Sequence, residues 1–271
     1  ALTNSFSSFL LTCALLEYKR RDSSYFIMTL ERFIQLWTHR YHKYSHIAKA
    51  HLLAYKNRLK YQKIKSNLKS GQPLIALIRT EHFGDIVAAE PITRHVKSIF
   101  PDAYIVWFVK PAFRELVDKN PHIDEVHPEF CVTERRLLME SGIFDQVFQL
   151  QFRNNNECRK CQVFLDNPLA VERNINVMNY FNYGNLLEVF AKTGGLIGMD
   201  EAFPGDAHPK LYMGLKQIAK VDSLHLPKQF IVIHTQSNYA PKDWPKERWN
   251  LLIDWLTMDK KIHVVEIGLT S

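Results

Sequence analysis

The stretch LIALIRTEHFGDIVAAEP, residues 74–91, runs from an uninterrupted apolar segment directly into a loop of ionisable residues. Five consecutive apolar residues, 74–78, indicate a strand that is buried on both faces, as in a parallel sheet. The loop at its carboxyl end contains Arg79, Thr80, Glu81, His82, Gly84 and Asp85. Because open α/β sheets bind ligands at the carboxyl ends of their strands, we interpret this loop as a candidate site.

Short apolar segments alternate with helical segments along the rest of the chain. The pattern predicts strands at residues 74–78, 104–109, 123–126, 144–152, 230–234 and 263–267, and helices at residues 86–100, 112–119, 183–192 and 245–256. Such alternation is typical of βαβ units, which build a parallel sheet with helices on both faces. The sequence therefore predicts an α/β fold.

Three domains are predicted from the breaks in this pattern. Residues 1–70 form a basic amphipathic helical extension, since residues 28–69 contain no Gly or Pro and end at Ser-Gly-Gln-Pro. Residues 71–205 form an N-terminal domain, and a Gly- and Pro-containing linker leads to residues 206–271. One βαβ unit is too small for a stable domain, so this last domain is expected to be incomplete.

Basic charge is concentrated in the predicted extension. The chain has a net charge of +7, and residues 28–70 contain ten Lys or Arg against one acid, a local charge of +9. The remainder is close to neutral, and no nucleic-acid partner is expected. Two interpretations stay open for the extension: a solvated helix that packs on the domain behind it, or a surface that docks on an anionic membrane or a partner.

Four cysteines, Cys13, Cys131, Cys158 and Cys161, are too few and too scattered for a secreted disulfide framework, which favours a reducing compartment. The single Cys158-x-x-Cys161 pair has only Cys131 and scattered histidines as distant companions, so we expect structural cysteines and no metal site. The longest apolar segment, residues 9–16, is too short for a transmembrane helix.

A second polar loop follows the predicted strand at residues 230–234. The stretch IVIHTQSNYAPKDWPKERW, residues 231–249, places Thr235, Ser237 and Lys242 before a helix that begins near Pro245. Hydroxyls, backbone donors and a lysine at a helix entrance suit a diphosphate, whose charge is spread over several oxygens. The alternative is a solvated loop anchored by Trp244 and Trp249.

Together these stretches resemble glycosyltransferase family 9, the ADP-heptose:lipopolysaccharide heptosyltransferases. The resemblance is carried by LIRTEHFGDIVAAEPITRHVKSIFPDAYIVWFV, NPHIDEV and IHTQSNYAPKDWPKERWNLLIDWL, in that order. It implies a GT-B fold with two Rossmann-like domains, here with the C-terminal one truncated. It also implies an inverting transfer that requires no cofactor and no metal.

The resemblance implies a role for each motif. Asp85 would be the base that takes the proton of the acceptor hydroxyl, although the residues alone leave open that it only caps the following helix. Lys242 would hold the leaving diphosphate, with Thr235 and Ser237 as further phosphate contacts. The acceptor-side loop would consist of Arg79, Thr80, Glu81 and His82.

The implied function is transfer of heptose from ADP-heptose to a lipid-linked saccharide acceptor in lipopolysaccharide biosynthesis. The expected location is the cytoplasm, peripheral to the inner membrane through residues 28–70. Two departures stand out: the family usually has small residues in place of Glu81 and His82, and its Asp-Thr-Gly-x-x-His motif is not found in this sequence. The alternatives are transfer from another nucleotide sugar, or a non-catalytic module that docks on a membrane or a partner.

Overall fold

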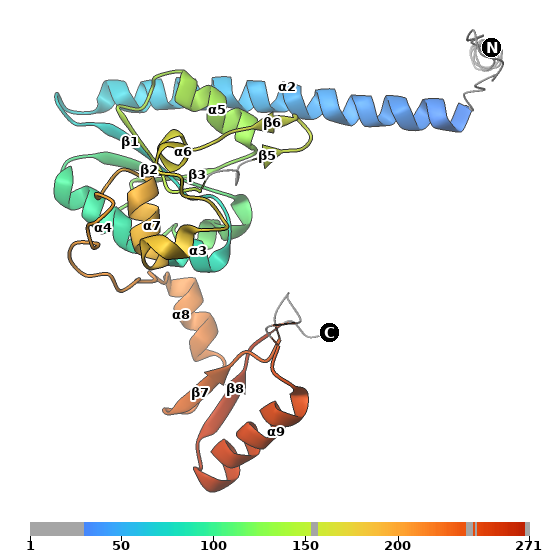
Figure 1. The fold of residues 1–271 in the computed structure, drawn as a ribbon, viewed down its shortest axis with the longest axis vertical. Helices are drawn as coiled ribbons and strands as arrows, with labels where there is room; N and C mark the ends of the chain where they lie inside the picture. The colour runs from blue at the N-terminus through green and yellow to red at the C-terminus, as the bar shows by residue number, and fades with distance from the viewer. Residues whose placement is uncertain (1–29, 153–156, 237–240, 242, 269–271) are drawn as a thin grey trace. The chain divides into compact units, whose positions relative to one another are not determined.

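The computed structural model describes residues 30–152, 157–236, 241 and 243–268 (Figure 1). The chain divides into two compact units, Ala1–Tyr212 and Met213–Ser271.

A parallel sheet forms the centre of the first unit. Its described strands are β1 (Leu74–Ile78), β2 (Tyr104–Val109), β3 (Glu125–Pro128) and β4 (Gln146–Gln149), in the order β3-β2-β1-β4. β1 is paired on both sides: Leu77 lies opposite Trp107 of β2 and opposite Phe148 of β4. The predicted α/β fold with a parallel sheet is confirmed.

Helices cover both faces of this sheet, which explains why its strands read as continuous apolar runs (Figure 1). The helices of one face are α2 (Leu30–Asn67) and α5 (Val132–Glu140), and those of the other include α3 (Phe83–Ala88), α4 (Glu90–Ile99) and α7 (Leu186–Thr193). The side chains of β1 alternate between them. Ile75 and Leu77 belong to the core on the α4 and α7 face, whereas Leu74, Ala76 and Ile78 belong to the core on the α2 and α5 face.

The helical prediction after β1 was wrong in detail. A single helix was predicted at residues 86–100, but α3 ends at Ala88 and α4 begins at Glu90, with Ala89 between them. Pro91 lies in the first turn of α4, where its missing N–H costs nothing but where it prevents a continuous helix. The predicted helix at residues 112–119 is the shorter 3₁₀ helix η1 (Pro111–Leu116).

Helix α2 is part of the first unit rather than a separate extension. Ala50, Ala54 and Tyr61 on its C-terminal half are buried. The Tyr61 hydroxyl lies 2.7 Å from Nδ1 of His127 and donates to Glu125 at 3.2 Å, and burial is the largest cause that raises the pKa of Tyr61. The N-terminal half is mostly exposed. The C-terminal half of the helix therefore packs on the domain behind it, as the first interpretation of residues 28–70 expected, and docking by the exposed N-terminal half stays a prediction.

The first unit extends beyond residue 205, where the sequence pattern predicted its end. Residues 206–212 are held against α4 by two side chains of that helix: Arg94 donates to Asp206 at 3.0 Å, and Glu90 accepts from the backbone N–H of Lys210 at 2.9 Å. Glu90 also accepts from the Tyr212 hydroxyl at 3.3 Å. These bonds explain why the compact unit ends at Tyr212.

Residues 157–183 contain short elements that the sequence pattern did not resolve. They are the hairpin of β5 (Glu157–Cys158) and β6 (Val163–Phe164), the helix α6 (Pro168–Glu172), and the 3₁₀ helix η2 (Tyr180–Tyr183). α7 begins with a capping box between Asn185 and Glu188 and ends before Gly194, close to the predicted end.

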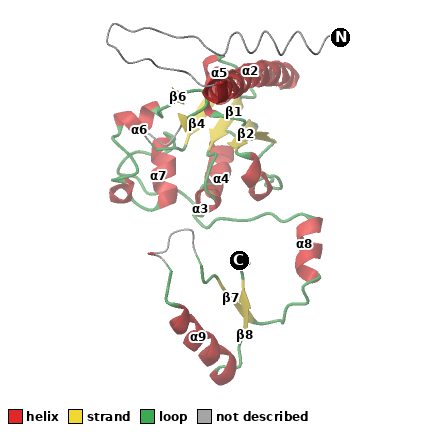
Figure 2. Ribbon diagram, turned by 90° about the vertical axis from the view of Figure 1, so that its right-hand side faces the viewer, coloured by secondary structure: helices red, strands yellow, loops and turns green. Residues whose placement is uncertain are grey.

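The second unit contains one parallel strand pair among its described residues (Figure 2). Its elements are α8 (Leu215–Asp222), which was not predicted, β7 (Phe230–Ile233), α9 (Lys246–Asp254), the π-helical turn η4 (Trp255–Asp259), and β8 (His263–Glu266). Of its described apolar side chains, Ile233 and Leu256 are buried. None of the described helices, in either unit, is long and apolar enough to cross a membrane.

Candidate functional site

The loop after β1 lies at the point where the strand order of the first sheet reverses. The chain passes from β1 through β2 to β3 on one side, and then returns to place β4 on the other side of β1. In open α/β sheets, the diverging loops at such a point leave a crevice at the carboxyl ends of the strands. The predicted acceptor-side residues follow β1 directly, so the topology places them where this fold class binds ligands.

Asp85 does not cap the helix that follows the loop. α3 begins at Phe83, so Asp85 lies in its first turn and His82 takes the cap position without a side-chain cap bond. His82 has a φ of 64°, a conformation that is uncommon for a residue with a side chain. The chain therefore turns sharply at His82, directly before α3. The cap interpretation of Asp85 was wrong, and its carboxylate is available for another partner.

That partner is Arg79. The guanidinium of Arg79 forms an ion pair with the Asp85 carboxylate, and the arginine side chain is 2% exposed while that of Asp85 is 26% exposed. Behind the pair, the guanidinium lies 4.5 Å from the ring centroid of Phe190. Burial lowers the pKa of Arg79, and the charge of Asp85 opposes that change. The pair therefore fixes a partly exposed carboxylate on a buried cation.

The rest of the loop is fastened to neighbouring strand ends. Gln151, which follows β4, donates from Nε2 to Oγ1 of Thr80 at 2.8 Å, and the backbone N–H of Lys110 donates to the Thr80 carbonyl at 2.9 Å. Glu81 forms an ion pair with Lys110. The structure thus joins residues from the ends of β1, β2 and β4, while His82 stays exposed.

The predicted donor-side residues lie in the second unit. Thr235 follows β7, and its hydroxyl donates to the carboxylate of Glu266 at the end of β8. A hydroxyl committed to a carboxylate would have to change partners before it could contact a phosphate. Ser237 and Lys242 lie outside the described residues, so their predicted contacts remain predictions.

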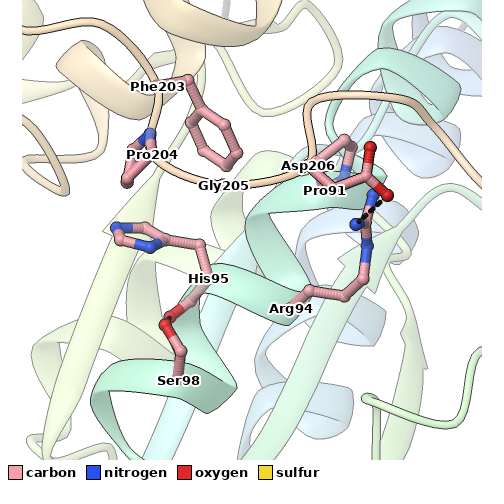
Figure 3. A pocket seen from close by; sticks show the side chains of 8 residues that line it. All are labelled: Pro91, Arg94, His95, Ser98, Phe203, Pro204, Gly205 and Asp206. Carbon is pink, nitrogen blue, oxygen red and sulfur yellow. Dashed lines mark hydrogen bonds and ion pairs between the residues drawn. The ribbon is translucent and has the colours of Figure 1, made fainter.

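A separate pocket of about 310 Å³ lies on the outer side of α4 (Figure 3). It lies between Arg94 and His95 of the helix and residues 203–206, and the ring of Phe203 packs edge-on against His95 with 5.4 Å between ring centroids. The Arg94 guanidinium in its wall is already bound to Asp206. None of the described acceptor-side or donor-side residues lines this pocket, so we do not connect it with the candidate site.

The structure also brings together four side chains from three separate stretches of the sequence. His46 of α2, Cys131 at the start of α5, and Cys158 and Cys161 of the β5–β6 hairpin each offer one ligand atom, and all four atoms lie within 4.8 Å of one another. The three cysteines are free thiols. The expectation that Cys131 and the histidines lie far from Cys158 and Cys161 was wrong, because α2 and α5 pack side by side above the hairpin.

Comparisons with known proteins support the fold. No protein-family model matches the chain, and no curated protein matches it. Among solved structures, the chain is similar to a glycosyl transferase family 9 structure from Veillonella parvula, with a TM-score of 0.51 and 15% identity over 74% of this chain and 64% of that chain.

Two E. coli structures are also similar, with lower TM-scores. The first is ADP-heptose lps heptosyltransferase II, with a TM-score of 0.45 and 20% identity over 72% of this chain and 64% of that chain. The second is heptosyltransferase WaaC with ADP-2-deoxy-2-fluoro heptose, with a TM-score of 0.41 and 16% identity over 73% of this chain and 69% of that chain.

The likeness to the Veillonella structure confirms the α/β, GT-B fold class that the sequence resemblance implied. At 15% identity it concerns the fold, and this chain spans 64% of the length of that protein.

Proposed function

We propose that this protein is an inverting glycosyltransferase that moves a heptose from ADP-heptose to an acceptor of the lipopolysaccharide-core type. One observation carries the proposal: the Asp85 carboxylate is held by buried Arg79 at the carboxyl end of β1, where the strand order reverses. The fold likeness to a family 9 glycosyltransferase structure supports it.

In the proposed reaction, Asp85 accepts the proton of the acceptor hydroxyl while that oxygen forms a bond to the anomeric carbon. The bond from this carbon to the diphosphate breaks on the opposite side, and ADP leaves with the electron pair. Arg79 orients the carboxylate without contacting the sugar. Thr80 and Glu81, tied to the ends of β4 and β2, would shape the acceptor side, and His82 would face the acceptor.

The donor side is proposed from the sequence motif. Lys242 and Ser237 would stabilise the charge that develops on the leaving diphosphate, and Thr235 would join them after releasing Glu266. We propose a cytoplasmic location, with the exposed half of α2 resting on the inner membrane where a lipid-linked acceptor is presented. The two alternatives are another nucleotide-sugar donor and a non-catalytic docking module.

The test is release of ADP by the longest protein that the gene encodes, with ADP-heptose and a lipid A–Kdo acceptor. Asp85→Asn keeps an oxygen that can accept from Arg79 but removes the base, so we expect the rate to fall by about 10²–10⁴-fold. Asp118→Asn is the matched control, because Asp118 pairs with Arg114 on an exposed helical turn. Its rate should equal that of the wild type.

The outcomes separate the alternatives. Equal rates for wild type and Asp85→Asn would reduce Asp85 to a counter-ion of Arg79 and reject it as the base. If the wild type releases ADP from no heptose donor but releases a nucleotide from another sugar nucleotide, the donor assignment fails. If it turns over no sugar nucleotide at all, the docking module replaces the enzyme.

A further inference from the structure

The cluster of His46, Cys131, Cys158 and Cys161 has the composition of a structural metal site. Three sulfurs and one imidazole nitrogen are a ligand set that zinc uses in tetrahedral structural sites. Zinc lies about 2.3 Å from sulfur and about 2.0 Å from nitrogen, so its ligands are about 3.3–3.8 Å apart. Sγ of Cys158 already lies 3.4 Å from Nε2 of His46, and no two of the four atoms are more than 4.8 Å apart.

Each ligand comes from an element whose position is fixed independently. The ring of His46 packs on Phe130, with 4.6 Å between centroids and an angle of 31° between the rings. Phe130 directly precedes Cys131, which lies at the first position before α5. Cys158 ends β5, and Cys161 lies in the turn that leads to β6. Figure 1 shows this hairpin next to α2 and α5.

The surroundings suit thiolates bound to a cation. Cys131 lies directly before the first turn of α5, where the backbone N–H groups of Thr133 and Glu134 face its sulfur. Three thiolates on a divalent cation leave one net negative charge, and two lysines, Lys49 and Lys160, lie close to His46.

A buried hydroxyl next to the cluster lacks a hydrogen-bond partner among the described residues. The Thr133 side chain is 2% exposed, and its Oγ1 has no hydrogen-bond partner in the described part of the chain. The hydroxyl lies close to the sulfur of Cys161. A thiolate at Cys161 would give this donor an acceptor, which a protonated thiol does only weakly.

The β5–β6 hairpin needs an anchor that its own contacts do not provide. Each strand has two residues, and an isolated two-stranded hairpin is at best marginally stable. Phe164 is 68% exposed, and the described polar bond from the turn to α2, from Lys43 to Gln162, is on the surface. A metal ion would fasten the hairpin to both helices through buried bonds.

We propose that His46, Cys131, Cys158 and Cys161 bind one zinc ion, which holds the β5–β6 hairpin against α2 and α5. The role is structural, since all four positions of a tetrahedral ion are taken by protein ligands. A disulfide between Cys158 and Cys161 is the competing use of the same residues, but it would leave Cys131 and His46 without a function. The proposal does not depend on the proposed transferase activity.

The first experiment measures metal content in the full-length chain, purified under reducing conditions without chelator. We expect about one zinc per chain by plasma mass spectrometry. Replacing the zinc with Co²⁺ should give the intense absorption of thiolate-to-cobalt charge transfer together with the visible bands of a tetrahedral site. Removing the metal should lower the Tm by about 5–10 °C, and adding Zn²⁺ should restore it.

Variants then test which residues bind. Cys161→Ser and His46→Ala should each weaken zinc affinity by at least about 100-fold. His42→Ala is the control, because His42 lies one turn earlier on α2, is exposed and does not belong to the cluster. It should retain the zinc and the Tm.

Several results would overturn the proposal. They are a metal-free chain whose Tm does not respond to added Zn²⁺, stoichiometric iron in place of zinc, a Cys158–Cys161 disulfide detected by mass spectrometry in the protein as purified, or unchanged zinc binding in both variants. The cobalt titration uses the wild-type chain, so it decides the question even if a variant fails to fold.

Discussion

At the scale of single residues, the environment of a carboxylate decides what it can do. Asp85 and Asp145 are both aspartates with a cationic partner. Asp85 is paired with a fully buried arginine in a loop at the carboxyl end of β1. Asp145 lies at the opposite end, where β4 begins, and accepts from Lys65 at 2.6 Å and from the backbone N–H of Leu74 at 2.8 Å. The position of Asp85 therefore suits a reactive carboxylate, whereas Asp145 attaches α2 to the sheet.

The Asp145 contacts predict a pH dependence of stability. Burial alone would raise the pKa of Asp145, but its bonds to Lys65 and Leu74 lower it below the ordinary value of 3.8. The carboxylate therefore stabilises the fold above that ordinary value, and the stabilisation is lost as the pH falls through the lower, folded pKa. Asp145→Asn should lower the free energy of unfolding by about 1 kcal/mol at pH 7, with a difference that narrows below about pH 4.

Urea unfolding of wild type and Asp145→Asn between pH 3 and pH 7 checks this prediction. Asp118→Asn, in an exposed pair with Arg114, should change the free energy of unfolding by less than about 0.5 kcal/mol. The prediction is contradicted if the difference in unfolding free energy between wild type and Asp145→Asn stays constant down to pH 3. Protonation of Asp145 should weaken its contacts in the wild type, whereas the asparagine of the variant has no proton to gain.

At the scale of elements, the two halves of the continuous helix α2 differ in how far their side chains are buried. Its C-terminal half is anchored by Tyr61 and Lys65. Its N-terminal half carries an aromatic stripe that consists of Phe33, Trp37, Tyr41 and Tyr44, all between 42% and 70% exposed. These residues are spaced at three or four positions and therefore share one face. Basic residues such as Arg40 and Lys43 accompany them.

The stripe predicts binding to anionic vesicles. Aromatic rings enter the interface while Lys and Arg attract anionic headgroups, so binding should increase with anionic lipid and decrease with salt. The double variant Trp37→Ala and Tyr41→Ala should reduce the fraction of protein bound to vesicles by about 10-fold in a flotation assay. The reason is that two aromatic side chains would no longer insert into the lipid interface. Leu215→Ala removes an 86% exposed apolar residue from α8 and serves as the control. Equal binding to zwitterionic and anionic vesicles would contradict the predicted attraction between the basic residues and anionic headgroups.

At the scale of the whole molecule, the two units differ in how well their sheets are covered. All five residues of β1 are fully buried, whereas Phe230, Ile231 and Val232 of β7 are 36–50% exposed. The two described strands of the second unit and their helix bury little apolar surface. The backbone hydrogen bonds of β7 and β8 should therefore open more readily than those of the sheet in the first unit.

Hydrogen exchange measures this difference directly. The amides of β1 and β2 should exchange at least about 10-fold more slowly than those of β7 and β8, because the central strands open only with the whole unit. Spectra recorded on the full chain allow both sheets to be compared in one sample. Equal protection of β7 and β1 would contradict the prediction and would indicate that another surface covers the second sheet.

Elements that are buried on both faces could be predicted closely from the sequence. The strands at residues 74–78 and 104–109 have the predicted bounds, because an uninterrupted apolar run has few alternatives to the centre of a parallel sheet. The ends of helices were less predictable, as the break at Ala89 shows. The short hairpin at residues 157–164 has no periodic pattern, since two-residue strands are too short to give one.

The sequence by itself determined the α/β class, the position of the first loop after β1, and the group of residues that this loop presents. Only the tertiary structure decided which side chains these polar residues contact. Asp85 turned out to pair with Arg79 instead of capping a helix, and His46 came within 3.4 Å of Cys158 across 112 residues of sequence. The physical reason is that local patterns determine which face of an element is apolar, whereas contacts between polar residues far apart in sequence depend on how the covered faces pack against one another.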